Sequence, residues 1–306
     1  MLSFPEKPSE KVAVLLLAFN RPSLTDKVLG SIGHYAPPDL YVALDGPRPG
    51  RKDDELNGAA ITESVSAWEA ANPATRVHRL YRKKNLGCGR GVSSAITWFF
   101  SQEEMGIVLE DDCLPNLAFF SFCERLLWQY RDAEKIMHIG GSNHLHGGIT
   151  VDSTYYFSKY PQIWGWASWK RAWEKYRLEM PDLESLFSLP AFRRYYKKEI
   201  FLITGRGDLD TWDIQWIYAF LMNDGLSILP RDNFIKNLGF DNNGGTHLQA
   251  KPSWYDDTTT EIEVLVPPDS ITQNQAADDY VFRTVYNPSA LSRIKRKLKK
   301  LLFKKG

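Results

Sequence analysis

Short apolar runs alternate with helical patterns over the first third of the chain, and this alternation constrains the fold most strongly. Residues 12–18 are continuously apolar, which is typical of a strand buried on both faces. Further strands are predicted at 41–44, 77–81 and 106–109, and helical patterns at 24–32, 61–71 and 91–100. The charged segment between Pro47 and the helical pattern at 61–71 is predicted to be a loop. Strands that alternate with helices predict an α/β fold, Rossmann-like, with a mostly parallel sheet flanked by helices.

The second half of the chain carries weaker patterns. The predicted elements there are helices at 116–130 and 211–223 and strands at 136–139 and 226–229. Residues 164–176 hold four tryptophans and are predicted to form a turn followed by a helix, whereas 197–209 fit neither pattern. Residues 237–247 are a loop rich in glycine and asparagine, and no internal repeat or domain linker interrupts the chain.

Composition excludes several classes of protein. The formal net charge of +1 gives no overall field that would attract nucleic acid, so no nucleic-acid partner is expected. Cys88, Cys113 and Cys123 form no CxxC pair and no even-numbered disulfide framework. The first residues lack the pattern of a signal peptide, and the run at 12–19 is too short to cross a bilayer. We therefore expect a cytoplasmic protein.

Three adjacent carboxylates follow the fourth predicted strand. Glu110, Asp111 and Asp112 repel one another, so a fold tolerates them best where a cation or hydrogen-bond donors neutralise them. Ligands of open α/β sheets bind beyond the carboxyl ends of the strands, where this triplet lies. A hard divalent ion bound by one or two carboxylates takes its other ligands from water and phosphate. The triplet therefore predicts a metal site, with a solvated acidic loop as the alternative.

Two more charged residues follow strands at the same edge. Arg21 comes after the first strand and Asp45 after the second. An arginine at that edge can bind phosphate, and a carboxylate can accept from a base N–H or a ribose hydroxyl. Each alone would be an ordinary loop charge, but together they predict a nucleotide pocket.

Other patterns in the sequence lead to no site. The run Gly87-x-Gly89-x-Gly91 follows a strand, but Val92 stands where the dinucleotide-binding fingerprint needs its third glycine. A tight strand-to-helix turn is the better interpretation. His138, His144 and His146 lie close in sequence, yet neither a cysteine nor a carboxylate is near enough to complete a zinc site. The hydrolase motif GxSxG is absent from the sequence.

An ordered series of motifs resembles the GT-A glycosyltransferases, and most closely the bacterial nucleotide-diphospho-sugar transferases similar to N-acetylglucosaminyltransferase I. The series is LAFNRP at 17–22, Asp45-Gly46, Asn85-Leu86-Gly87, Glu110-Asp111-Asp112 and Thr211-Trp212-Asp213. Further blocks that resemble the family are WGWASW at 164–169, NDGLSI at 223–228, NLGF at 237–240 and Thr246-His247. The resemblance spans about residues 12–250.

The resemblance implies a GT-A fold and a role for each matched position on the donor side. Asp112 would coordinate Mn²⁺ or Mg²⁺, and His247 would help to bind the metal or the pyrophosphate. Asp111 would face the donor ribose, and Arg21 and Asp45 would hold the nucleotide. The residues implied to bind the donor are Asn20, Arg21, Asp45, Asn85, Gly87, Glu110 and Asp111.

On the acceptor side, Asp213 matches the carboxylate that serves as catalytic base in inverting members of the family. The motif here lacks the doubled aspartate before the tryptophan, so Asp210 is a rival for that role. Aromatic rings stack on the apolar faces of sugars, so Trp164 or Trp166 is expected to bind the acceptor. Two of the four tryptophans are expected in the core.

These inferences give the domain organisation and the function that we expect. Residues 1–250 would form the GT-A domain, with a nucleotide-binding half at about 10–115 and an acceptor-side catalytic half at about 116–250. Residues 251–291 would be a C-terminal extension. The expected activity is inverting transfer of a sugar from a nucleotide-diphosphate sugar, with UDP favoured, to a hydroxyl of a glycan or glycolipid. The alternatives are a sugar-phosphate nucleotidyltransferase and a non-catalytic carbohydrate-binding protein with a GT-A fold.

The last residues differ from the rest of the chain. Eight basic residues fall within 293–305, and the apolar residues between them have helical spacing. Residues 292–306 are therefore predicted to form a basic amphipathic tail that could bring the protein to an anionic surface at the inner face of a membrane. A solvated C-terminal helix is the alternative.

Overall fold

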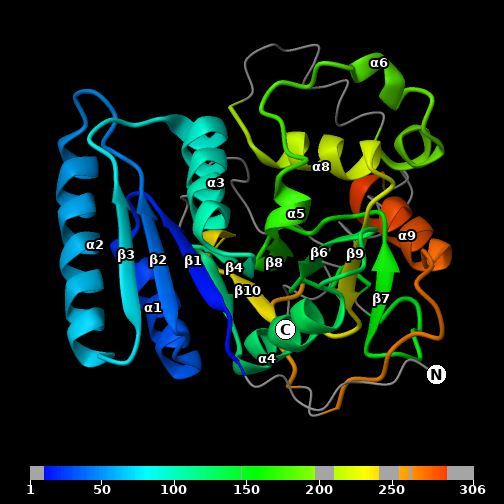
Figure 1. Ribbon diagram of the computed structural model, residues 1–306, viewed down its shortest axis with the longest axis horizontal. Helices are drawn as coiled ribbons and strands as arrows, with labels where there is room; N and C mark the ends of the chain where they lie inside the picture. Colours follow the sequence, from blue (N-terminus) through cyan, green and yellow to red (C-terminus); the bar gives the residue numbers. More distant parts are fainter. Residues whose placement is uncertain (1–9, 146, 197–209, 241–254, 262–263, 288–306) are drawn as a thin grey trace, which may run out of the picture.

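The computed structural model describes residues 10–145, 147–196, 210–240, 255–261 and 264–287 (Figure 1). Within them, one eight-stranded sheet runs through the molecule in the order β3-β2-β1-β4-β8-β6-β9-β7. Its strands are β1 (Ala13–Ala18), β2 (Asp39–Leu44), β3 (Arg76–Tyr81), β4 (Met105–Glu110), β6 (Ile136–Gly140), β7 (Tyr155–Ser158), β8 (Trp166–Trp169) and β9 (Leu226–Pro230). All six strands that the sequence predicts are present.

Most neighbouring strands of the sheet are parallel. Strand β1 pairs in parallel with β2 and β4, β2 with β3, and β6 with β9. Strand β8 is antiparallel to both of its neighbours, β4 and β6, and β7 is antiparallel to β9 at the sheet edge. A separate two-stranded ribbon joins β5 (Cys113–Pro115) to β10 (Ile235–Asn237). The predicted α/β fold with a mostly parallel sheet is confirmed.

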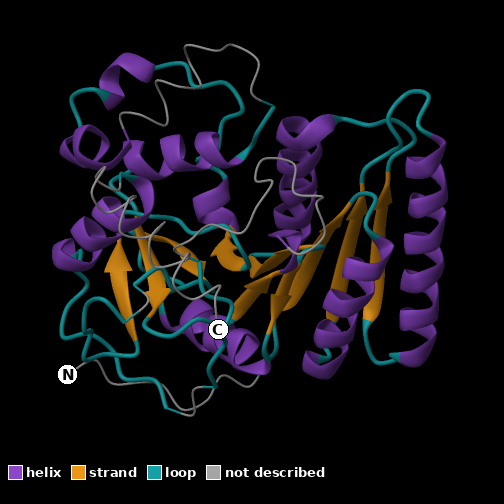
Figure 2. Cartoon of the chain, turned by 180° about the vertical axis from the view of Figure 1, so that it is seen from behind, coloured by secondary structure: helices purple, strands orange, loops and turns teal. Residues whose placement is uncertain are grey.

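Helices cover both faces of the sheet (Figure 2). They are α1 (Pro22–Tyr35), α2 (Lys52–Ala71), α3 (Ser93–Gln102), α4 (Leu117–Gln129), α5 (Lys170–Trp173), α6 (Leu183–Leu186), α8 (Asp213–Met222) and α9 (Gln275–Val281). Helices α1, α2 and α4 share one apolar cluster with one face of β1, β2 and β4. Helices α3, α5 and α8 share a second cluster with the opposite face. Alternate residues of β1 point to the two clusters, as the period of a strand requires.

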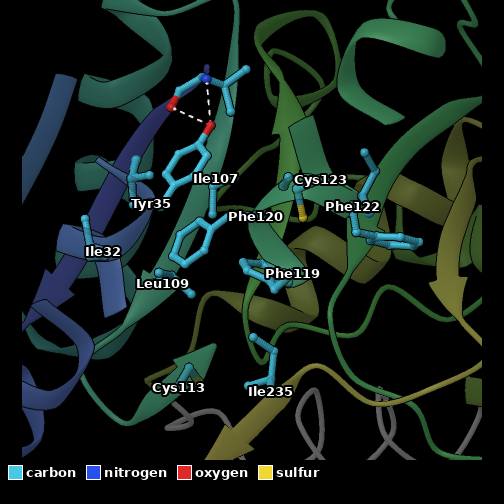
Figure 3. Packing of buried hydrophobic residues seen from close by; sticks show 14 of the residues in the cluster. Ile32, Tyr35, Ile107, Leu109, Cys113, Phe119, Phe120, Phe122, Cys123 and Ile235 are labelled. Carbon is cyan, nitrogen blue, oxygen red and sulfur yellow. Dashed lines mark hydrogen bonds between the residues drawn. The ribbon is translucent and has the colours of Figure 1, made fainter. Parts of the chain in front are cut away.

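The C-terminal end of α1 is fixed to the start of β1 by Tyr35. Its ring stacks on Phe120 of α4 with ring centroids 4.5 Å apart (Figure 3), and its hydroxyl accepts a hydrogen bond from the backbone N–H of Val12 at 2.9 Å. At its other end α1 begins directly after Arg21, where Pro22 favours the first helical turn. Arg21 is therefore held at the carboxyl end of β1.

Two predicted elements differ from the structure. The charged segment expected as a loop forms the first turns of α2, which begins at Lys52 rather than at 61. Three acidic residues in its first turn favour a helix N-terminus, because they complement the helix dipole. The segment 164–176 contains strand β8 before the short helix α5, not a turn followed by a helix. Pairing of β8 with β4 and β6 decides its conformation, and a single segment of sequence does not reveal that pairing.

The described part of the C-terminal extension packs on the sheet edge. Asp278 of α9 is fully buried and accepts hydrogen bonds from Ser158 Oγ at 2.5 Å, the Lys159 N–H at 2.9 Å and Gln273 Nε2 at 2.7 Å. Burial raises the pKa of Asp278 to about 6, although these donors lower it. The extension therefore contributes to the folded unit.

Several predictions fall outside the described residues. They concern His146, His247, the segment 197–209 and the tail 292–306. Among the helices that the structure describes, none combines the length and the apolar character needed to cross a membrane.

Candidate active site at the carboxyl edge of the sheet

Arg21 and the acidic triplet meet where β1 and β4 end side by side. The guanidinium of Arg21 lies between two carboxylates: Nη1 donates to Asp112 Oδ2 at 2.7 Å, and Nη2 donates to Asp111 Oδ1. Parallel pairing of β1 with β4 brings the two strand ends together, because Leu17 lies opposite Glu110. Three of the predicted site residues are thus in direct contact.

The electrostatics of this cluster follow from burial and from the single cation within it. Burial, and then the charge of Asp112, raise the pKa of Glu110 well above its ordinary value. Burial also raises the pKa of Asp111, an effect that Arg21 partly offsets. For Arg21 burial alone would lower the pKa, but the charges of Asp111 and Asp112 outweigh it and keep the guanidinium protonated. The single charge of Arg21 therefore offsets part of the negative charge of the cluster.

The residues around Asp112 fit a divalent ion that takes few protein ligands. The described residues contain no cluster of three or more histidine, cysteine or acidic side chains able to enclose a metal. Asp112 offers one carboxylate, and Gly239 leaves open beside it the space that a side chain would fill, since a Cβ there would lie 2.6 Å from Asp112 Oδ2. An ion such as Mn²⁺ or Mg²⁺ that keeps water and binds substrate phosphate needs no larger protein cage.

Asp45 binds the neighbouring loop rather than pointing into open space. Its carboxylate accepts from the backbone N–H groups of Leu86 at 3.0 Å and Gly87 at 3.2 Å, and from Asn85 Nδ2 at 3.1 Å. Asn85 also donates to the carbonyl of Gly46 at 3.0 Å. The loops after β2 and β3 are therefore joined. Direct contact of Asp45 and Asn85 with a donor stays a prediction, and in this structure their polar atoms serve the loop.

Asn20 connects the end of β1 to α2. Its amide donates to Asp54 Oδ1 at 2.8 Å, and Asp54 also forms an ion pair with Arg48 at 2.7 Å. The guanidinium of Arg48 lies over the ring of Phe19, 5.3 Å from its centroid. The sequence analysis missed Arg48 and Asp54, because both fall in the charged segment interpreted as a loop. The acidic residues in the first turn of α2 were the sequence signal from which the helix start at this site could have been recognised.

Asp210 closes the glycine turn that follows β3. Its two carboxylate oxygens accept from the N–H groups of Cys88 and Gly89, each at 2.7 Å. Gly87 has a φ of +79°, and a Cβ on it would lie 2.1 Å from Asp210 Oδ2. Only glycine fits there without strain. Asp210 thus has a structural role at this turn, which weakens its candidacy as the catalytic base.

Asp213 is placed differently. It is the first residue of α8 and is partly exposed, and Thr211 Oγ1 donates to its Oδ1. Its Oδ2 has no hydrogen-bond partner among the residues described. A Cβ on Gly89 would lie 2.9 Å from the carbonyl oxygen of Thr211, so the start of α8 lies against the glycine turn at the carboxyl end of β3. The structure therefore brings Asp213 to the same edge as Arg21 and Asp112.

The tryptophan segment differs from the prediction. Trp166, expected as an acceptor-binding candidate, has no exposed surface and stacks on Trp212 at 5.6 Å, so no sugar can reach its ring. Trp169 and Trp173 are buried as well, which puts three of the four tryptophans in the core rather than two. Trp164 is only partly buried, and its ring contacts Phe240 and Tyr255 edge-on. Trp164 remains the acceptor-side candidate.

Comparisons with known proteins give weak likenesses. The sequence matches no known protein family and no curated protein. Among solved structures, a mannosyltransferase from Pyrobaculum calidifontis in complex with GDP-Man and Mn²⁺ matches with a TM-score of 0.41 and 11% identity, over 57% of this chain and 50% of that one. GalNAc-T7 with UDP, GalNAc and Mn²⁺ matches at 0.42 and 9%, over 72% and 43%. A UDP-glucose pyrophosphorylase complexed with UDP-glucose matches at 0.40 and 9%, over 75% and 94%.

The match spans half or less of the mannosyltransferase and of GalNAc-T7. Likenesses at this level do not establish a function for this chain, and none of them shows a relation to N-acetylglucosaminyltransferase I.

Proposed function

We propose that this chain is an inverting glycosyltransferase of the GT-A kind. It would move a sugar from a nucleotide-diphosphate sugar, with a UDP-sugar favoured, to a hydroxyl of a glycan or glycolipid, assisted by Mn²⁺ or Mg²⁺. The observation that carries the proposal is the gathering of Arg21, Asp112 and Asp213 at the carboxyl edge of the parallel strands. Open α/β sheets bind their ligands at that edge.

On the donor side, the chain offers charges suited to a diphosphate. Asp112, with His247 as a further proposed ligand, would hold the divalent ion, which as a Lewis acid stabilises the charge on a departing diphosphate. Arg21 presents a planar pair of N–H donors, the geometry that phosphate oxygens accept best. Asp45 and Asn85 fix the loop that would border the nucleotide.

On the acceptor side, Asp213 would take the proton from the attacking hydroxyl. Thr211 holds one of its oxygens, which leaves the other available to a substrate. A base opposite the leaving group gives inversion at the anomeric carbon, and general-base assistance typically contributes 10²–10⁴-fold in rate. Trp164 would contact the acceptor.

Binding of donors tests the proposal first. The full chain is melted with a panel of nucleotide-sugars, with and without Mn²⁺. A ligand at 100 times its dissociation constant stabilises the fold by about 2.7 kcal/mol. We expect a UDP-sugar to raise the melting temperature only when Mn²⁺ is present. A nucleotidyltransferase would instead respond to a sugar phosphate together with a nucleoside triphosphate, and a binding protein would respond to glycans without any nucleotide.

Loss of Asp112 tests the metal. Asp112→Asn removes the charge that would bind the ion but keeps an oxygen for Arg21, so the variant is expected to fold and to lose donor turnover. EDTA should abolish turnover by the parent, and Mn²⁺ or Mg²⁺ should restore it. Asp132→Asn, which changes a carboxylate that is 89% exposed and remote from the cluster, is the control. Full turnover in EDTA would contradict metal assistance.

A further inference from the structure

The Asp111 and Asp112 carboxylates already have a cation in this structure. Arg21 is the only basic side chain among the described residues that forms an ion pair with either of them. Asp111 is 2% exposed and Asp112 is 9% exposed, so little water is available to stabilise their charges. Two adjacent buried carboxylates without a counter-charge would be costly. The arginine therefore supplies, from within the chain, part of the positive charge that a bound divalent ion would supply from outside.

The position of the guanidinium matters as much as its charge. Nη1 of Arg21 donates to Asp112 Oδ2 at 2.7 Å. This hydrogen bond occupies one lone pair of the oxygen, so no metal ion can bind along the same direction while it is present. The other oxygen of the same carboxylate, Oδ1, accepts from Cys113 Sγ at 3.5 Å. An ion that binds Asp112 through Oδ2 must displace Arg21 or lie against its positive charge.

We propose that Arg21 is an internal counter-cation that competes with the divalent ion for Asp112. The inference rests on the proposed metal-assisted function and concerns the protein before a donor binds. With Arg21 in place, the protein would stay folded without metal and bind a free divalent ion weakly. A guanidinium displaced by the ion would be available to the diphosphate of the donor, so the metal and the donor would bind more tightly together than either binds alone.

Mn²⁺ binding in the absence of nucleotide tests the competition directly. Free Mn²⁺ is measured by electron paramagnetic resonance as it is titrated into the parent, Arg21→Gln and Arg21→Lys. We expect Arg21→Gln to bind Mn²⁺ at least tenfold more tightly than the parent. Arg21→Lys should fall between them, because an ammonium keeps the charge but cannot bridge both carboxylates. Equal or weaker Mn²⁺ binding by Arg21→Gln would overturn the proposal.

Thermal melting gives a second readout that does not depend on activity. The parent is expected to melt at the same temperature in EDTA and in Mn²⁺ at a concentration too low to displace Arg21. Arg21→Gln should melt well below the parent in EDTA and recover in Mn²⁺, because the ion replaces the missing charge. Failure of Mn²⁺ to raise its melting temperature would count against the proposal. If Arg21→Gln does not fold in EDTA, Arg21→Lys decides: tighter Mn²⁺ binding than the parent supports competition, and equal binding overturns it.

A matched control lies at the opposite end of the strands. Arg76 at the start of β3 also forms a two-pronged ion pair, through Nε at 2.8 Å and Nη2 at 2.7 Å, with the largely buried Asp39. Arg76→Gln should leave Mn²⁺ affinity unchanged, and a tenfold gain there would mean that any lost positive charge produces the effect.

The outcomes separate this inference from the proposed function. If the parent binds Mn²⁺ in the presence of UDP but Arg21→Gln binds Mn²⁺ no more tightly than the parent, the competition is overturned and the proposed function is not. Absence of Mn²⁺ binding by all variants, with and without UDP, overturns metal assistance and the competition with it.

Discussion

Substitution of Asp210 separates its structural role from the catalytic role proposed for Asp213. Asp210→Asn replaces one of two oxygens that accept backbone N–H groups at 2.7 Å, so an NH₂ group would face an N–H donor. A hydrogen bond to a charged group contributes about 1.5–3 kcal/mol. Asp210 is exposed, so water replaces part of this, and we expect a loss of about 1–2 kcal/mol. At about 2–4 °C per kcal/mol, the melting temperature should fall by roughly 2–8 °C.

Asp213→Asn should show the opposite pattern. Its amide oxygen still accepts from Thr211, so we expect a melting temperature within about 1–2 °C of the parent. Transfer of sugar should slow at least a hundredfold, because a lost general base costs about 10²–10⁴-fold. Asp210→Asn should keep transfer within about tenfold of the parent. Thermal melting and turnover with the best nucleotide-sugar measure both effects.

Asp53→Asn is the control for these two variants, because it changes an exposed carboxylate in the first turn of α2. If Asp210→Asn melts with the parent, the contact between Asp210 and the glycine turn contributes nothing to stability. If Asp210→Asn is the slow variant and Asp213→Asn is nearly normal, Asp210 is the base and the assignment proposed above is wrong.

Two further predictions concern Asp278 and the tryptophans. The pKa of Asp278 is raised to about 6 from 3.8, so folding favours its neutral form, and the parent loses up to about 3 kcal/mol as pH rises from 4 to 7. Asp278→Asn cannot ionise; urea unfolding should show its stability relative to the parent rising over that range, and a constant difference would contradict the shift. Trp166→Ala should lose about 3–5 kcal/mol of stability, whereas Trp164→Ala should chiefly raise the KM for the acceptor. An unchanged acceptor KM in Trp164→Ala would remove that residue from the site.

Much of the parallel half of the sheet could be predicted from the sequence, for a local reason. Strands β1 and β4 lie in the interior of the sheet between two layers of helices, so both faces are buried and the run of apolar residues is continuous. Strand β8 has only four residues, and its conformation depends on pairing with β4 and β6, which lie far away in the sequence. A local pattern could not distinguish it from the start of a helix.

The sequence indicated which residues lie at the candidate site but not which atoms each of them contacts. The carboxyl ends of parallel strands meet at one edge, so the convergence of Arg21 and Asp112 follows from the strand pattern alone. The partner of each side chain depends on how the loops fold. Arg21 pairs with carboxylates, and Asp45 accepts from the loop after β3. Residue type and position along a strand do not specify such contacts.

The order of strands also has a consequence for synthesis of the chain on the ribosome. Strand β4 pairs with β1 on one side and with β8 on the other, and β8 is made about 60 residues after β4. At about 5–20 residues per second, the second edge of β4 waits roughly 3–12 s for its partner. An apolar strand with an open edge readily pairs with other chains. During the interval between β4 and β8, a chaperone that covers this edge would therefore protect the chain from such pairing.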